Sequence, residues 1–261
     1  MVNGLILAED GRKMSKSLKN YPDLWPTIEK YGADSLRFFL ASSPATRGEE
    51  VAFSEKNLDE VNKKVFNRID NMHSFIAMYA VDENNKPLPR AANQYSEGEV
   101  LAMLESLKHP LDAWVIARLN QTIDLVTTNL ENYVLDKATR PILDLIDDVS
   151  TWYLRRSRDR FKGSDGAEGD SSAASAATDR DDAIFTLRFV LERLSRIMAP
   201  VTPFMADHLY RKVRFGNTES VHLESWPTVM HIDGDDTKAG AASKGAGIIE
   251  NMTKVRDLVE T

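Results

Sequence analysis

The stretch that decides the interpretation of this chain is Gly11-Arg12-Lys13-Met14-Ser15-Lys16-Ser17-Leu18-Lys19-Asn20, close to the N-terminus. It follows the apolar run Leu5-Ile6-Leu7-Ala8, which predicts a short buried strand. Gly11 allows the backbone to turn sharply after that strand. A short loop rich in cations, hydroxyls and backbone donors suits a polyphosphate, because dense negative charge needs several donors at once.

The alternative interpretation of this stretch is a solvated Lys-rich turn, since charge runs usually form solvated surface. However, the string Lys13-Met14-Ser15-Lys16-Ser17 is identical to the second signature of the class I aminoacyl-tRNA synthetases. The longer string from Ser17 to Asp23 resembles the isoleucyl members of that family, although Leu24 stands where they carry a proline. The resemblance extends from about Gly4 to Trp226.

The resemblance implies a reaction and assigns roles in it to the loop. ATP, as a substrate, and isoleucine give isoleucyl-adenylate, and the aminoacyl group then passes to the terminal ribose of tRNA. Lys16 would be the principal catalytic lysine, with Lys13 as its helper. The ATP-binding residues implied by the match are Lys13, Met14, Ser15, Lys16 and Ser17. Mg²⁺ would accompany the ATP phosphates, but no metal site is recognisable in this sequence, whose histidines lack metal-ligand spacing.

Composition narrows the class of protein. The chain has 261 residues, 42% of them hydrophobic, and no cysteine, which removes disulfides and thiolate zinc sites. No apolar run approaches the ~20 residues that cross a bilayer, so we expect a cytoplasmic protein with no membrane partner. The net charge of −7 argues against binding DNA through bulk charge and restricts RNA binding to local cationic patches.

Apolar residues recur three or four apart over most of the chain, a spacing typical of amphipathic helices. The predicted helices cover residues 24–31, 33–41, 54–79, 96–108, 110–130, 135–161, 181–198, 203–213 and 248–259. Pro141 should kink or break its helix. A short strand is predicted at residues 220–224.

Two segments are poor in large apolar residues and are predicted to be flexible. Residues 163–182 are rich in Gly, Ser, Ala and Asp, and residues 231–247 are also small and polar. Such segments bury too little apolar surface to offset their ordering entropy. The helix predicted at 248–259 has no obvious partner in the chain.

The predicted fold is mainly α: an antiparallel helical bundle of the anticodon-binding type, attached to a small α/β remnant of a class I catalytic domain. We expect residues 1–47 to be the end of the catalytic domain. Residues 48–215 should form the anticodon-binding bundle, with 163–182 as a flexible insertion. Residues 216–261 should form a partly flexible junction segment.

A second cationic cluster lies at the end of the predicted helix 135–161. On a helical wheel of about 100° per residue, Arg156 and Arg160 continue the apolar stripe of Leu145, Val149 and Trp152. Favourable contact with the helix dipole explains one or two terminal cations, but not arginines on the core-facing stripe. Contact with tRNA phosphates and bases explains them better. The predicted tRNA-binding residues are Trp152, Tyr153, Arg155, Arg156, Arg158, Arg160 and Lys162.

Three functions remain open from the sequence. The first is part of an isoleucine–tRNA ligase, or of a valyl or leucyl relative, that needs an N-terminal catalytic half as partner. No His-Ile-Gly-His-like first signature occurs here, so the chain alone should be inactive in adenylation. The second is a stand-alone tRNA-binding module. The third is a helical interaction scaffold with a vestigial loop.

Overall fold

A small parallel sheet opens the structure, a computed structural model that describes residues 3–82, 84–163, 170–230 and 238–260. Strand β1 (Ile6–Leu7) pairs with β2 (Val51–Ala52), so that Ile6 lies beside Val51. The sequence predicted β1 but missed β2, because two residues carry too little pattern to mark a strand.

Helices make up most of the remaining chain. Their bounds are α1 (Leu24–Tyr31), α2 (Ala33–Ser42), α3 (Glu55–Val61), α4 (Asn67–Tyr79), α5 (Pro89–Ala92), α6 (Glu97–Ser106), α7 (Pro110–Glu131), α8 (Leu135–Asp147), α9 (Leu154–Lys162), α10 (Asp170–Met198), α11 (Pro203–Val213) and α12 (Lys238–Glu260). Two π-helical segments, η2 (Asn62–Phe66) and η3 (Asp148–Tyr153), join α3 to α4 and α8 to α9. The mainly α fold class is confirmed. Helix α8 runs through Pro141 without a break.

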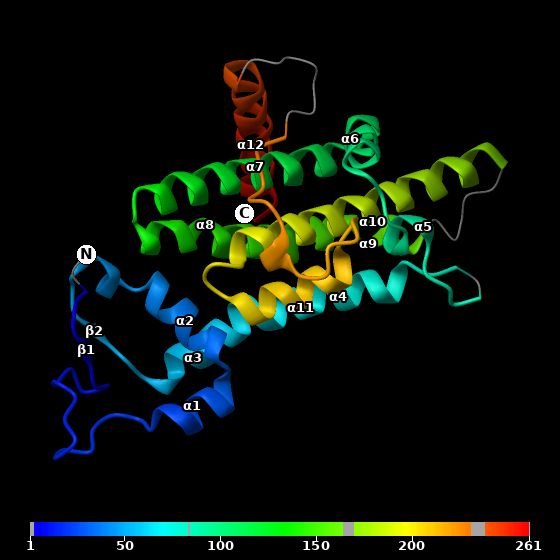
Figure 1. Cartoon of the computed structure of the whole chain (residues 1–261). Helices are drawn as coiled ribbons and strands as arrows, with labels where there is room; N and C mark the ends of the chain where they lie inside the picture. Colours follow the sequence, from blue (N-terminus) through cyan, green and yellow to red (C-terminus); the bar gives the residue numbers. More distant parts are fainter. Residues whose placement is uncertain (1–2, 83, 164–169, 231–237, 261) are drawn as a thin grey trace.

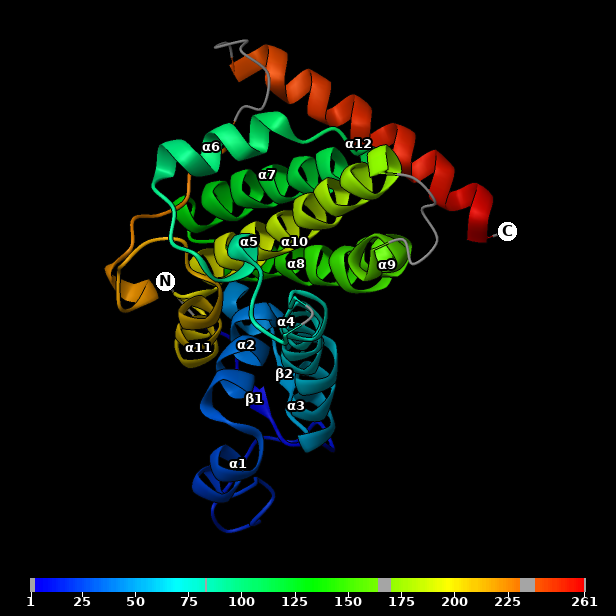
Figure 2. The ribbon, with the colours of Figure 1, turned by 90° about the vertical axis from the view of Figure 1, so that its right-hand side faces the viewer.

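The helices form layers, and the two-stranded sheet lies at the lower end of the molecule in Figure 1. Helices α7, α8 and α10 run alongside one another, with α11, α4 and α2 beneath them, and α1 and the two strands lie lowest (Figure 1; Figure 2). One apolar core joins these layers, and it includes Phe38 of α2 as well as Trp152 and Phe161. A smaller apolar cluster around Phe39, Phe53 and Leu58 supports the strands. No helix in the described ranges is long and apolar enough to cross a membrane.

The prediction of a disordered insertion over residues 163–182 is wrong for residues 170–182, which form the start of α10; residues 164–169 lie outside the described residues. Alanines favour a helix there, and polar anchors fix it in place of apolar burial. Asp179 accepts from Arg160 at 2.9 Å, Arg180 donates to the Val81 carbonyl at 3.0 Å, and Asp182 accepts from Arg90 at 2.7 Å.

The C-terminal predictions also need correction. Residues 238–247 were expected to be flexible but belong to α12, while residues 231–237 lie outside the described residues. Helix α12 has a partner: it packs on α7, and Ile248, Ile249 and Met252 lie against the core. The predicted strand at 220–224 is instead a single 3-10 turn over Val221–Leu223.

The π-helical segment η3 explains an error in the helical wheel. A π turn holds one residue more than an α turn, so it advances the buried stripe by one position. Ser157 and Phe161 therefore take the core positions, whereas Arg156 is exposed and the Arg160 side chain, 9% exposed, lies at the edge of the core. The helix also does not leave the bundle, because α10 packs along α9.

Arg160 lies beside the core in an internal network instead. Its guanidinium makes two parallel bonds to Asp112 of α7, at 2.9 and 2.7 Å, and further bonds to Asp179 of α10. The Asp112 carboxylate is fully buried and also accepts from the Tyr153 hydroxyl at 2.7 Å. Burial alone would lower the pKa of Arg160, but these carboxylates raise it above its ordinary value. The network ties α7, α9 and α10 together.

Removing Asp112 should therefore destabilise the fold strongly. In Asp112→Ala, the Arg160 guanidinium, only 9% exposed, loses its buried counter-charge. We expect a loss of about 3 kcal/mol or more in the free energy of unfolding, measured by urea titration at unchanged m-value.

The matched control is Asp159→Ala on α9, the helix of Arg160, where the Asp159 side chain is 99% exposed. Its unfolding free energy should stay within about 0.5 kcal/mol of the parent. A loss below about 1 kcal/mol in Asp112→Ala would contradict the role given to the network.

Candidate nucleotide loop and RNA-binding face

The signature loop leaves β1 through a tight turn and is closed by one side chain. Ala8 accepts from the Gly11 amide at 2.9 Å, and Gly11 has a φ of 77°, a conformation that suits glycine. The Asn20 side chain then spans the loop. Its carbonyl oxygen accepts from the Ser15 amide at 2.8 Å, and its amide nitrogen donates to the Lys13 carbonyl at 3.2 Å. Asn20 thus holds the signature residues in a compact turn.

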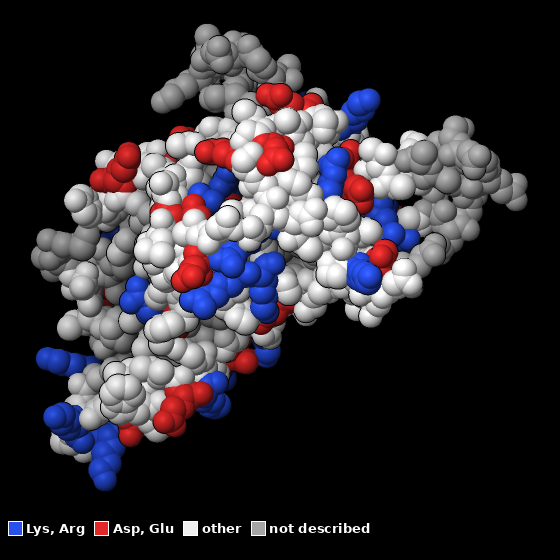
Figure 3. Space-filling view, turned by 45° about the vertical axis from the view of Figure 1, so that its right-hand side comes forward, with Lys and Arg blue, Asp and Glu red and all other residues white. Residues whose placement is uncertain are grey.

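Three lysines project from this turn without counter-charges. Lys13, Lys16 and Lys19 are exposed, and none makes an ion pair with a residue that the structure describes. Arg12, in contrast, is paired with Asp10 at 2.6 Å. Figure 3 shows cationic side chains standing out at the lower left end of the molecule, where Figure 1 places the segment before α1. Because like charges repel, unpaired lysines on a closed loop form a place for an anion.

The two serines of the signature lie between these lysines. Their hydroxyl oxygens are 2.7 Å apart, so one donates to the other. Each hydroxyl retains capacity for a further bond, since a serine oxygen both donates and accepts. The loop therefore combines ammonium groups with neutral donors, which is the mixture that a polyphosphate requires.

Met14 faces the opposite way from the lysines. Its side chain packs against the apolar cluster of Phe39 and Phe53 and lines an apolar pocket of about 250 Å³ beneath the loop. Tyr21 and Leu24 line the same pocket. This packing anchors the loop to α2 through the second residue of its signature.

Helix α9 carries the second candidate site, a cationic face that we call the α9 face. It consists of the exposed side chains of Arg155, Arg156, Arg158 and Lys162. The three arginines make no ion pair within the described ranges, and Lys162 lies 3.9 Å from the exposed Asp159 carboxylate. The Arg156 guanidinium stacks over the ring of Trp152 at 4.7 Å, which orders it for planar contacts.

Three of the predicted tRNA-binding residues do not lie on that face. Tyr153 is fully buried, and burial together with the Asp112 charge raises its pKa well above the ordinary value. The Arg160 guanidinium is enclosed by Asp112 and Asp179. The predictions of direct RNA contact by Tyr153 and Arg160 are therefore wrong for this structure, because Tyr153 lies in the core and the Arg160 guanidinium is bound by two carboxylates under α10. Trp152 is 5% exposed, and its ring lies beneath the Arg156 guanidinium.

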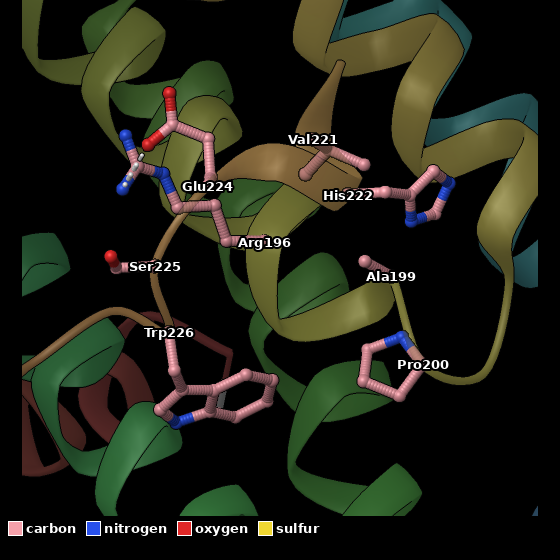
Figure 4. Close-up of a pocket in the computed structure, with 8 residues that line it drawn as sticks. All are labelled: Arg196, Ala199, Pro200, Val221, His222, Glu224, Ser225 and Trp226. Carbon is pink, nitrogen blue, oxygen red and sulfur yellow. Dashed lines mark ion pairs between the residues drawn. The ribbon is translucent and has the colours of Figure 1, made fainter. Parts of the chain in front are cut away.

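A further pocket, beside the corner between α10 and α11, has its polar groups already engaged (Figure 4). Arg196 pairs with Glu224 at 3.0 Å, and the His222 ring lies 3.2 Å from the Pro203 carbonyl. The Trp226 indole donates to Thr127 at 2.8 Å. These groups hold the segment after α11 against the bundle.

Two residues that shape the sites were missed in the sequence. Asn20 carried no signal beyond its position after the lysines. Asp112 did carry one: it stands three and four residues before the core residues Val115 and Ile116, on the apolar stripe of its helix. A carboxylate on such a stripe predicts a buried partner, which is Arg160.

Two family models match this chain, and they place the signature loop and the α9 face in different domains. Residues 112–260 match the family model for the anticodon-binding domain of tRNA ligase. Residues 1–52 match the model for class I tRNA synthetases (I, L, M and V). The first match contains the α9 face, and the second contains the signature loop.

Similar proteins are isoleucine–tRNA ligases. That of Treponema denticola is 36% identical over 228 residues, and that of Bdellovibrio bacteriovorus is 38% identical over 231 residues. Each alignment covers 87% of this chain and 20% of the relative, so the chain spans about one fifth of the length of the curated relatives it matches.

Solved structures share the fold at low sequence identity. The Agrobacterium radiobacter LeuRS, in a ternary complex with tRNA and LeuAMS, has a TM-score of 0.56 at 18% identity, covering 92% of this chain and 24% of its own. The Mycobacterium tuberculosis methionyl-tRNA synthetase, in complex with methionyl-adenylate, has a TM-score of 0.59 at 19% identity, covering 78% of this chain and 36% of its own. With the family models, these likenesses confirm the predicted relationship to class I synthetases. The chain therefore belongs to the tRNA ligase family that is defined by this anticodon-binding domain.

Proposed function

We propose that the chain supplies two parts of an isoleucine–tRNA ligase: a loop that handles the phosphates of ATP and a helical face that binds tRNA. One observation carries the proposal. A loop closed by Asn20 leaves lysines unpaired, and the same chain exposes the α9 face on a bundle of the anticodon-binding family. The isoleucine–tRNA ligases among its relatives support isoleucine as the amino acid.

The reaction places charge where the loop can stabilise it. When the isoleucine carboxylate attacks the α-phosphate of ATP, negative charge builds on the departing pyrophosphate. We assign Lys16 as the principal group that stabilises this charge and Lys13 as its helper, because both are exposed and unpaired among the described residues. Ser15 and Ser17 would donate to phosphate oxygens, and the Met14 backbone would lie near the adenine. Mg²⁺ would come with ATP, and we assign it no ligand in this chain.

Binding of tRNA is assigned to the α9 face. Arginine suits this role, because its planar guanidinium makes paired bonds to phosphate and stacks on bases. An overall charge of −7 supports a local patch as the RNA-binding surface, since it would repel RNA from other faces. The isoleucine-accepting tRNA is the proposed partner.

The domain limits remain part of the proposal. We assign residues 1–47 to the catalytic domain, 48–215 to the anticodon-binding bundle and 216–261 to a junction segment. Adenylate formation would require the catalytic half that this chain does not span, so the chain alone should be inactive. We place the complete enzyme in the cytoplasm, where translation occurs.

The second candidate is a stand-alone tRNA-binding module. It is favoured by the fact that the α9 face and its supporting core lie within this chain, whereas the alignments cover one fifth of each relative. A module of this kind would bind tRNA but would not need the lysines of the loop. The two experiments below separate these candidates.

The first experiment tests the loop. In a complete ligase formed by joining this chain to a catalytic half, Lys16→Ala should lower the rate of isoleucine-dependent pyrophosphate exchange by about 10²-fold or more. The Michaelis constant for isoleucine should change little, because Lys16 acts on the leaving group.

The control for this experiment is Lys64→Ala. It removes an exposed lysine of η2 that is paired with Glu60 of α3. Its exchange rate should equal that of the parent enzyme. An unchanged rate in Lys16→Ala would remove that lysine from the mechanism and favour the tRNA-binding module.

The second experiment tests the α9 face. Filter binding of isoleucine tRNA to the chain should weaken with salt, and Arg155→Ala and Arg158→Ala should each reduce the slope of log affinity against log salt by about 1. The matched control is Arg211→Ala in α11, an exposed arginine paired with Asp207.

The control should leave the slope unchanged. Equal slopes for the parent and for both α9 variants would show that the α9 face makes no phosphate contact, even if the chain binds tRNA elsewhere.

A further inference from the structure

Helix α2 lies between the signature loop and the helical bundle, as both ribbon views show (Figure 1; Figure 2). It contacts both sides through neighbouring residues. Phe38 is buried in the bundle core, whereas Phe39 belongs to the cluster that holds Met14 of the loop. Any rotation or tilt of α2 against the bundle would therefore move the loop.

Side-chain packing restricts the crossing angle of such a helix to a few preferred values, with a scatter of about 15–20°, and burial of apolar surface is itself non-directional. Hydrogen bonds are directional and set orientation more sharply. The polar contacts of α2 with the bundle therefore set the orientation of α2, and with it the position of the loop.

Two charged residues, one turn apart on α2, make these contacts at the corner between α10 and α11. The Arg37 guanidinium donates to the carbonyls of Pro200 and Val201, each at 2.9 Å, just beyond the C-terminal end of α10. The Asp34 carboxylate accepts from the Met205 amide at 2.7 Å, in the first turn of α11.

The signs of both charges match the helix ends that they contact. The C-terminal end of a helix carries partial negative charge, and Arg37 meets it there. The N-terminal end carries partial positive charge, and Asp34 meets it there. Exchanging the two charges would oppose both dipoles, so the pair fits the corner in one orientation only.

Asp34 is also held at a cost. Burial raises its pKa although the amides of Met205 and Phe204 and the charge of Arg37 favour the ionised form. Its second carboxylate oxygen is buried without a hydrogen-bond partner among the described residues. A group that only filled space here would be more stable as an apolar side chain, which indicates a requirement for direction.

From these contacts we propose that Asp34 and Arg37 are positioning residues. They lock α2 onto the α10–α11 corner and thereby fix the lysines of the signature loop relative to the α9 face. The functional consequence rests on the function proposed above, because a single tRNA would have to reach both places. The joint itself is a property of the structure and can be tested without nucleotide or RNA.

The absence of cysteine from the sequence makes the test direct. Spin labels on Glu29→Cys in α1 and Leu125→Cys in α7, both exposed positions, report the distance between the loop side and the bundle by pulsed electron spin resonance. We expect a single narrow distance distribution for the labelled parent chain. The variant Asp34→Ala/Arg37→Met should broaden that distribution or split it.

Far-UV circular dichroism of the same samples reports whether the helices remain formed. The matched control, Asp59→Ala/Lys63→Met, removes an exposed ion pair of 2.6 Å between α3 and η2 and should leave the distribution narrow. Arg37→Lys keeps the charge but loses the forked geometry. Arg37→Lys should also broaden the distance distribution, and it replaces the double variant in the test if that variant fails to fold.

A purely stabilising role would lower the melting temperature and leave the native distribution unchanged, which would overturn the proposal. A broad distribution in the parent chain would overturn it too. An unchanged exchange rate in Lys16→Ala, or failure of the parent chain to bind tRNA, would count against the proposed function alone, because the distance measurement contains neither ligand.

Discussion

Two adjacent phenylalanines on α2 impose the constraint on which the arrangement of the molecule depends. Phe38, 1% exposed, points into the bundle core, and Phe39, 9% exposed, points into the cluster beneath the signature loop. Burying each ring stabilises the fold by about 1.5–3 kcal/mol, so removing either phenylalanine from its cluster would lower the free energy of unfolding. A helix fixed on both sides in this way places the cationic signature loop at a defined position beside the helical bundle.

The charges of the protein follow one pattern. Inside the bundle, cations are matched to anions or to carbonyls: Arg160 to Asp112, and Arg188 to the Val213 and Asn93 carbonyls. Burial lowers the pKa of Arg188 to about 10, since no carboxylate bonds to it in the described structure. On the loop, Lys13, Lys16 and Lys19 make no ion pair among the described residues, and on α9 the same holds for Arg155, Arg156 and Arg158. Because buried carboxylates such as Asp112 are paired with other cations, in this case Arg160, these exposed cations remain available to phosphate groups from outside.

Much of the fold could be predicted from the sequence, because amphipathic periodicity marks helices such as α7 and α11 and a short identical string marks the loop. Two elements, the start of α10 and the strand β2, could not. The start of α10 is held by ion pairs between residues far apart in sequence, such as Asp182 and Arg90, which periodicity does not reveal. The strand β2 has only two residues.

The largest error in the candidate site came from a single extra residue. The π segment η3 shifts the buried face by one position, so that Ser157 and Phe161 take the core positions. Arg160, which the sequence assigned to RNA, is bound instead by Asp112 and Asp179. The presence of several cations on α9 could be predicted from the local composition. Which of them face solvent depends on the π-helical hydrogen bonds of η3, which the composition does not show. A buried acid at Asp112 was the signal that could have corrected the wheel.

The central claim is that this chain provides the phosphate-handling loop and the RNA-binding face of a tRNA ligase whose catalytic half lies elsewhere. Its most direct test is reconstitution with the catalytic half of an isoleucine–tRNA ligase, followed by assay of isoleucine-dependent pyrophosphate exchange. The account predicts exchange in the mixture and none with either part alone. Association of the two parts without exchange would contradict it.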